Sequence, residues 1–227
     1  MKKCGALVLG LAAAAAWLAR PDPVTPALPK YPARFAVRGL DISHHNGVID
    51  WAQVAKSGVT FVYVKASEGG DRADVRLAAN LLAARQAGLK VGAYHFFTFC
   101  RPGEEQAKHF LSLVKPEAGD LPPAVDVEFV GNCRDVPSRE VVRANLETWL
   151  ALVEKTFARR AVIYSTADAA DAFLTGLPNP LWLRELPGEP KRAWTFWQFD
   201  PGGTVPGIGG SVDLDVFRGD RAALDAL

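Results

Sequence analysis

Short apolar runs rich in β-branched residues alternate with longer stretches in which apolar residues recur at helical spacing, beginning near Val37. The runs predict strands and the longer stretches predict helices. The expected strands are residues 37–42, 59–66, 90–97, 124–129, 161–165, 181–184, 194–199 and 212–217. The expected helices are residues 51–57, 74–87, 104–114, 138–156 and 167–174.

Strands and helices alternate five times, which indicates a parallel sheet. Beyond the last expected helix the links become rich in glycine and proline, and residues 201–210, with five glycines and two prolines, cannot form a helix. We therefore predict an α/β fold: an irregular TIM-like barrel of five β/α units followed by three strands with few or no helices. An open doubly wound sheet is the alternative, although no glycine-rich phosphate loop follows the first strand.

The first 36 residues differ in composition from the rest. Lys2 and Lys3 precede an apolar run that is short for a membrane span, so residues 1–20 are expected to be a signal peptide or an uncleaved N-terminal anchor. Residues 21–36 contain five prolines and predict a stiff spacer. One folded domain is expected over residues 37–227, exported to the periplasm or the extracellular space and anchored to the membrane if the leader stays.

Composition narrows the functional class. The chain has 227 residues, of which 49% are hydrophobic and 22% charged, as in ordinary globular proteins. The net charge of +1 argues against a dedicated nucleic-acid partner. Loss of residues 1–20 would remove three positive charges and no acid, which changes the net charge to −2. We expect a monomer without a cofactor or a bound metal.

Polar side chains gather where the expected strands end, and in a parallel barrel these ends form the active-site face. Asp126 and Glu128 are two residues apart in one strand, so they point to the same side. Two close carboxylates repel each other, and one of them then holds a proton near neutral pH. Such a pair suits glycoside hydrolysis, in which one acid protonates the leaving oxygen. The alternative is an edge strand with two solvated acids.

Histidines and cysteines suggest further sites. His44 and His45 could ligate a metal with nearby acids, but adjacent residues of an extended chain point to opposite faces. Cys100 and Cys133 follow the third and fourth strands, so they reach one rim if those strands are neighbours. In an oxidising compartment they could form a disulfide that stabilises the fold by about 3–4 kcal/mol. The alternative is two free thiols.

Six short motifs follow one another along the chain. The first is Gly39-Leu-Asp-Ile-Ser-His-His-Asn-Gly47, with Ile49-Asp-Trp51 after it. The others are Phe61-Val-Tyr-Val-Lys-Ala-Ser-Glu-Gly69, Gly92-Ala-Tyr-His-Phe96, Leu121-Pro-Pro-Ala-Val-Asp-Val-Glu128, Trp197-Gln198 and Val212-Asp-Leu-Asp215. In this order the motifs resemble those of the glycoside hydrolase family 25 lysozymes, the Chalaropsis-type muramidases. The sixth strand departs from the family, which usually has an Ala-Xaa-Tyr ending where this chain has Leu181-Trp-Leu-Arg-Glu-Leu186.

The resemblance implies cleavage of the β-1,4 bond between N-acetylmuramic acid and N-acetylglucosamine in the glycan strands of peptidoglycan. It makes Glu128 the general acid, and Asp126 the residue that orients the substrate acetamido group or stabilises positive charge. Two further acids would line the site and tune the pKa of Glu128: Asp41 and Asp213. Four positions would lie near the substrate groove: Lys65, Tyr94, Tyr164 and Trp197. The rival hypotheses are a non-catalytic peptidoglycan-binding protein on the same barrel and a metal-dependent hydrolase.

Overall fold

The computed structural model describes residues 29–227. Eight strands form a closed barrel in the order β1-β9-β8-β7-β6-β5-β4-β2, and pairing of β1 with β2 completes the ring. The strands are β1 (Val37–Ile42), β2 (Phe61–Glu68), β4 (Lys90–Phe96), β5 (Ala124–Val127), β6 (Val162–Thr166), β7 (Leu181–Arg184), β8 (Phe196–Gly203) and β9 (Val212–Phe217). A two-residue strand, β3 (Arg72–Ala73), pairs with the end of β2.

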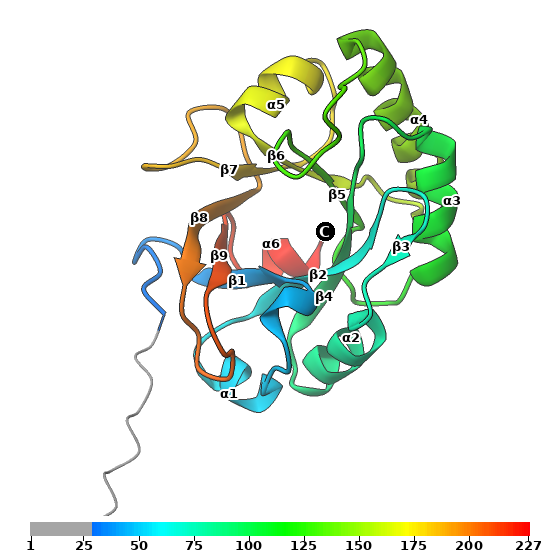
Figure 1. Cartoon of the computed structure of the whole chain (residues 1–227). Helices are drawn as coiled ribbons and strands as arrows, with labels where there is room; N and C mark the ends of the chain where they lie inside the picture. The colour runs from blue at the N-terminus through cyan, green and yellow to red at the C-terminus, as the bar shows by residue number, and fades with distance from the viewer. Residues whose placement is uncertain (1–28) are drawn as a thin grey trace, which may run out of the picture.

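Five helices follow the first five barrel strands and lie outside the ring (Figure 1). They are α1 (Trp51–Lys56), α2 (Leu77–Gln86), α3 (Gly103–Leu113), α4 (Arg139–Phe157) and α5 (Ala167–Phe173). A 3-10 turn, η1 (His44–Asn46), follows β1. No helix separates β7, β8 and β9, so the predicted architecture of five β/α units and three strands is confirmed. None of the helices within residues 29–227 is long and apolar enough to cross a membrane.

The last strand runs against its neighbours. β9 is antiparallel to both β1 and β8, while the other pairs in the ring are parallel. The glycine-rich link after Gly203 turns the chain back directly, as in a hairpin. The start of β9 therefore lies beside the carboxyl end of β1, with Asp213 opposite Asp41.

Two apolar clusters stabilise the barrel. One fills its interior with rings such as Phe61, Tyr63, Trp182 and Phe196, and the larger one lies between the strands and the helices. The interior rings need space, and a Cβ atom on Gly39 would lie 2.2 Å from the Phe61 ring. A short helix that the sequence did not predict, α6 (Arg221–Asp225), closes one end of the interior with the buried side chain of Leu224.

Part of the segment expected to be a proline-rich spacer packs against the barrel. Residues 1–28, which include the expected leader, lie outside the described part of the chain. Phe35 is buried against Trp194 and Trp197, and Tyr31 packs on Phe199 and donates a hydrogen bond to the Gly39 carbonyl. The segment that contains Tyr31 and Phe35 covers the outer face of β8, where no helix packs. The folded part of the chain therefore begins before Val37.

Candidate active site

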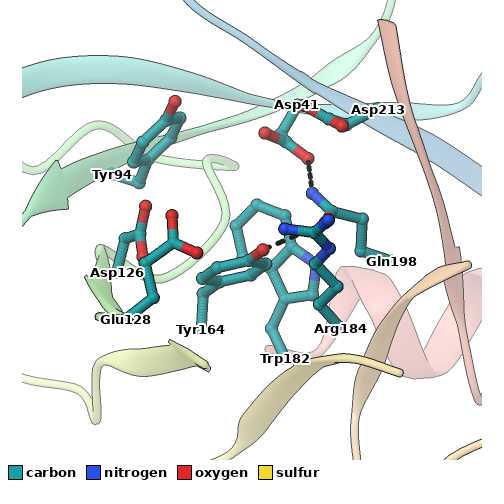
Figure 2. Close-up of a pocket in the computed structure, with 9 residues that line it drawn as sticks. All are labelled: Asp41, Tyr94, Asp126, Glu128, Tyr164, Trp182, Arg184, Gln198 and Asp213. Atoms are coloured by element: carbon teal, nitrogen blue, oxygen red, sulfur yellow. Dashed lines mark hydrogen bonds between the residues drawn. The ribbon is translucent and has the colours of Figure 1, made fainter. Parts of the chain in front are cut away.

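A polar cavity of about 150 Å³ opens at one end of the barrel (Figure 2). Nine side chains line it: Asp41, Tyr94, Asp126, Glu128, Tyr164, Trp182, Arg184, Gln198 and Asp213. The four acids expected from the sequence are all among them. The cavity is also the place where the carboxyl ends of the parallel strands meet, which is where (β/α) barrels carry their active sites.

The acids come from three strands. Asp126 lies in β5 and Glu128 directly follows it, and both point into the cavity as strand alternation predicts (Figure 2). Asp41 and Asp213 are register partners across β1 and β9. Asp213 reaches this end of the barrel only because β9 is antiparallel, so that its first residues lie at the mouth.

Asp41 is held by a chain of hydrogen bonds. The Tyr164 hydroxyl donates to Gln198 Oε1 at 3.0 Å, and Gln198 Nε2 donates to Asp41 Oδ2 at 2.8 Å (Figure 2). Below them the Trp182 indole donates to Asp215 Oδ1 at 2.7 Å. The tyrosine, glutamine and tryptophan thus fix the wall opposite Asp126.

Burial and the closeness of the carboxyl groups raise the pKa values of these acids. Removal from water is the first cause that raises the pKa of Asp41 and Asp126 well above the ordinary range, and neighbouring carboxylates add to it. The same causes raise the pKa of Glu128 and bring that of Asp213 to about 6. Arg184 opposes both of these shifts. The cavity therefore favours a shared state in which some of these carboxyl groups keep a proton while their neighbours are ionised, at pH values where exposed acids are all ionised.

Asp215 lies deeper than the other acids and is fully buried. Burial raises its pKa well above the ordinary range, and the charge of Asp41 raises it further. Burial therefore favours the protonated form of both Asp41 and Asp215.

Three buried carboxylate oxygens have no hydrogen-bond partner within residues 29–227, namely Asp215 Oδ2 beneath the cavity, Asp126 Oδ1 and Glu128 Oε2. Buried polar atoms in native proteins are nearly always paired, so each such atom calls for an explanation. Asp126 and Glu128 line the cavity. Their free lone pairs, or their protons, are available to a ligand.

A side-chain amide in the next loop fixes the position of Glu128. Asn132 Nδ2 donates to the carbonyl oxygens of Glu128 and Phe97, both at 2.9 Å. Its Oδ1 accepts from the Phe99 backbone N–H at 2.8 Å. The loops after β4 and β5 are thereby tied together directly behind the acid. Nothing in the local sequence pattern distinguished this asparagine.

The expected groove residues divide into three groups. Tyr94 and Tyr164 line the cavity. Lys65 lies beside it, where its charge lowers the pKa of Asp126, and its Nζ is 2.9 Å from Glu68 Oε2. A bulge between Lys65 and Ser67 breaks strict alternation, so Glu68 reaches the same side as the lysine.

Trp197 does not line the cavity. It is 5% exposed, belongs to the outer core with Phe35 and Trp194, and donates from Nε1 to the Glu185 carbonyl. Alternation along β8 turns its neighbours Phe196 and Gln198 inward and this ring outward. The expected contact between Trp197 and substrate is corrected accordingly: the groove residue of β8 is Gln198.

The two cysteines are free thiols in this structure. Both line the same surface pocket. Burial raises the pKa of the Cys133 thiol, and the neighbouring Cys100 raises it further. The backbone N–H of Cys133 also donates to Asn132 Oδ1 at 3.1 Å. The cysteine pair thus occupies the same junction between loops that supports Glu128.

The histidines considered as metal ligands lie elsewhere. His44 Nδ1 is 2.9 Å from Asp74 Oδ2, outside the acidic cavity. His95 is fully buried between Ser67 and Gln106, and burial lowers its pKa to about 3. Within residues 29–227 no three His, Cys, Asp or Glu side chains are grouped so that they could hold a metal ion.

The raised pKa values predict how stability varies with pH. Folded Asp213 binds its proton more tightly than the unfolded chain does, so its contribution is complete below about pH 4 and is lost as the pH rises through about 6. The Asp213→Asn variant should therefore show a shallower decline in the free energy of unfolding between these pH values. Urea unfolding at a series of pH values measures this slope. Asp135→Asn, an exposed control, should retain the wild-type slope; a wild-type slope in Asp213→Asn would contradict the burial of that acid.

Comparison with known proteins agrees with this geometry. The profile of glycosyl hydrolases family 25 matches residues 40–208. Lysozyme M1 of Streptomyces globisporus is 34% identical over 213 residues, which cover 84% of this chain and 71% of that protein. Protein YegX of Escherichia coli O157:H7 is 36% identical over 206 residues, with 86% of this chain and 74% of that protein covered.

A solved family 25 glycosyl hydrolase from Bacillus anthracis superposes with a TM-score of 0.82 at 31% identity, over 90% of this chain and 99% of that one. The bacterial lysozyme of Streptomyces coelicolor gives a TM-score of 0.77 at 33% identity, over 85% and 96% of the two chains. The sequence profile, the lysozyme relatives and the barrel agree: this chain belongs to glycosyl hydrolase family 25 and is a glycoside hydrolase of the lysozyme type.

Proposed function

We propose that the chain hydrolyses the β-1,4 bond between N-acetylmuramic acid and N-acetylglucosamine in peptidoglycan, and that residues 37–227, together with the short segment that packs on β8 before them, form its catalytic domain. The observation that supports this most strongly is the convergence of Asp41, Asp126, Glu128 and Asp213 on one cavity. Glycoside hydrolysis needs a protonated carboxyl group next to an ionised one. Burial and mutual repulsion supply that combination here.

Glu128 is assigned the role of general acid. Its carboxyl is at the rim and less buried than that of Asp126, and its Oε2 has no protein partner among the described residues. The proton of Glu128 passes to the glycosidic oxygen as the bond from that oxygen to the anomeric carbon breaks. Positive charge then develops on the sugar ring, and water adds to the anomeric carbon and gives up a proton to a cavity carboxylate.

The other residues hold the substrate and the water. Asp126, with its unpaired Oδ1, faces the acetamido group or the developing charge. Asp41 and Asp213, across the cavity, hold the attacking water and adjust the pKa of Glu128. Tyr94 and Tyr164 contact the sugar, and Lys65 supports Asp126 from the side.

Release of reducing ends from purified sacculi tests this function. Wild-type protein should release them at a constant rate, and that rate should survive exhaustive chelation because the acids need no metal. Retention of the protein on sacculi without new reducing ends would favour a non-catalytic binding protein. Loss of the reaction on chelation and its return with a divalent metal would favour the metal-dependent alternative.

Export is part of the same proposal, because peptidoglycan lies outside the cytoplasmic membrane. Residues 1–20 would act as a cleaved signal peptide or as a retained anchor. Fractionation of cells that express the full chain, followed by N-terminal sequencing, separates the two forms. Recovery of the full-length chain in the cytosol would contradict export.

In the oxidising compartment we expect Cys100 and Cys133 to form a disulfide. A disulfide oxidant accepts two electrons while the two thiols lose two protons, and the sulfur–sulfur bond forms. The closed loop should stabilise the exported protein by about 3–4 kcal/mol. Alkylation and mass spectrometry before and after reduction should show two protected thiols, and reductant should lower the Tm of wild type but not of Cys100→Ser. Complete alkylation of both cysteines without reductant would contradict the pairing.

A further inference from the structure

Arg184 is a cation in a cavity otherwise lined by acids and neutral side chains. It is the last residue of β7 and is half-buried. Its guanidinium points into the space that Glu128 and Asp213 also face (Figure 2). The sequence of this strand departs from the family pattern, but it did not indicate a role for the arginine.

The Arg184 guanidinium is unpaired within residues 29–227. It forms no hydrogen bond and no ion pair with any side chain of these residues. Several other arginines within residues 29–227 pair with acids, as Arg192 does with Asp171. Its charge nevertheless reaches the site, because it lowers the pKa of both Glu128 and Asp213. The guanidinium thus offers N–H donors at the cavity that no acceptor within residues 29–227 takes up.

We propose that Arg184 binds a carboxylate carried by the glycan substrate and so makes the enzyme selective for anionic strands. This rests on the proposed hydrolysis of peptidoglycan. A guanidinium offers two parallel N–H donors that match the two oxygens of a carboxylate. Peptidoglycan carries such groups in two places: the lactyl carboxylate of muramic acid where no peptide is attached, and the carboxylates of the stem peptide.

The acidic lining explains why a cation is needed. Asp41, Asp126, Glu128 and Asp213 repel any anionic substrate to the extent that they are ionised. Arg184 offsets this repulsion locally and supplies a directional contact. A bound carboxylate also neutralises the guanidinium, which removes its depressing effect on the pKa of Glu128. Binding of the anionic substrate thus helps the proposed general acid to keep its proton.

The test compares kcat and KM of wild type, Arg184→Gln and Arg184→Lys on matched substrates. The first pair is peptide-free glycan strands with lactyl carboxylates that are either free or amidated. The second pair is peptide-bearing strands with stem carboxylates that are either free or amidated. The Arg184→Gln variant should raise KM at least about 10-fold more on a free-carboxylate substrate than on its amidated partner. Lysine should restore part of the loss, since it keeps the charge but not the paired geometry.

The arms identify the source of the carboxylate. If Arg184→Gln raises KM selectively only within the peptide-free pair, Arg184 binds the lactyl carboxylate. If the selective rise occurs only within the peptide-bearing pair, Arg184 binds a carboxylate of the stem peptide. Equal losses on all four substrates, or no change, would overturn the proposal. Hydrolysis of none of them by wild type would instead refute the proposed function. Arg192→Gln, which removes an arginine from an exposed ion pair, is the matched control and should behave as wild type.

The pH profile provides a second readout. Loss of the Arg184 charge raises the pKa of Glu128, so the alkaline limb of kcat/KM in Arg184→Gln should move to higher pH. This shift combined with selective loss on free-carboxylate substrates is the expected result. A shifted limb without any substrate discrimination would mean that the arginine only tunes the acids, and would overturn carboxylate recognition.

Discussion

The Glu128→Gln variant is expected to release reducing ends from purified sacculi at least about 1,000 times more slowly than wild type, because glutamine cannot donate the proton that the leaving oxygen requires. Glutamine has nearly the same shape, and the carboxyl it replaces is half-buried with a raised pKa. The fold should therefore be kept, with a Tm at neutral pH no lower than that of wild type. Reducing-end assays and thermal unfolding measure the two effects.

A substrate with a good leaving group makes this prediction specific for proton donation. Departure of a nitrophenolate from a synthetic glycoside needs no proton, so Glu128→Gln should lose far less activity on it than on sacculi. Glu117→Gln, at an exposed position outside the cavity, is the matched control and should keep wild-type rates. Full lytic activity of Glu128→Gln, or an equal loss on both substrates, would contradict the assigned role.

The Asp126→Asn variant is expected to lower kcat by about 100-fold or more, for a different reason. Asparagine keeps the size of the side chain but cannot carry the negative charge that Asp126 holds when the proton of the pair is on Glu128, and this charge stabilises the developing positive charge on the sugar. Charge develops on the ring whichever group leaves, so the loss should be similar on sacculi and on the nitrophenyl glycoside. Steady-state kinetics on both substrates, with circular dichroism to check the fold, provide the test.

The contrast between the two variants separates the two carboxyl roles. Asp135→Asn lies at an exposed position outside the cavity and serves as the control for this substitution. If Asp126→Asn recovered on the good leaving group while Glu128→Gln did not, the two assignments would have to be exchanged. If neither variant lost activity, the acidic cavity would not be the reaction site.

Most of the barrel could be predicted from the sequence because its strands are continuous apolar runs. The expected bounds of β1, β7 and β9 agree with the structure, and the other strands differ by a few residues at their ends. Helix α2 begins at Leu77 rather than at residue 74, because the Asp74 carboxylate accepts hydrogen bonds from the backbone N–H groups of His44 and Arg76. A tertiary contact of this kind leaves no periodic signal.

The short elements were missed for a related reason. β3 has two exposed residues, and α6 has five residues with one buried side chain, so neither contains a full hydrophobic period. The only local signal for α6 was Asp220, which caps the helix by accepting from the Ala223 backbone N–H at 2.8 Å. The antiparallel orientation of β9 was also unpredictable, because a pattern of apolar residues does not show whether a strand runs parallel or antiparallel to its neighbours.

The site was predictable where alternation holds and unpredictable where long-range packing decides. Asp126 and Glu128 share a face as their spacing predicts, whereas the bulge after Lys65 changes the face of Glu68. Trp197 was placed near the substrate by resemblance alone, while the segment that buries it comes from the proline-rich region before β1. Arg184 lay in the one strand that departs from the family pattern, and that departure was the available signal.

Mass spectrometry of the fragments released from purified sacculi, after borohydride reduction of the new ends, tests the central claim most directly. Proton donation by Glu128 to the oxygen that follows muramic acid predicts that every new reducing end is N-acetylmuramic acid. It also predicts that these fragments are absent when Glu128→Gln replaces the wild-type protein. New ends on N-acetylglucosamine, or muramic acid ends produced equally well by the glutamine variant, would contradict it.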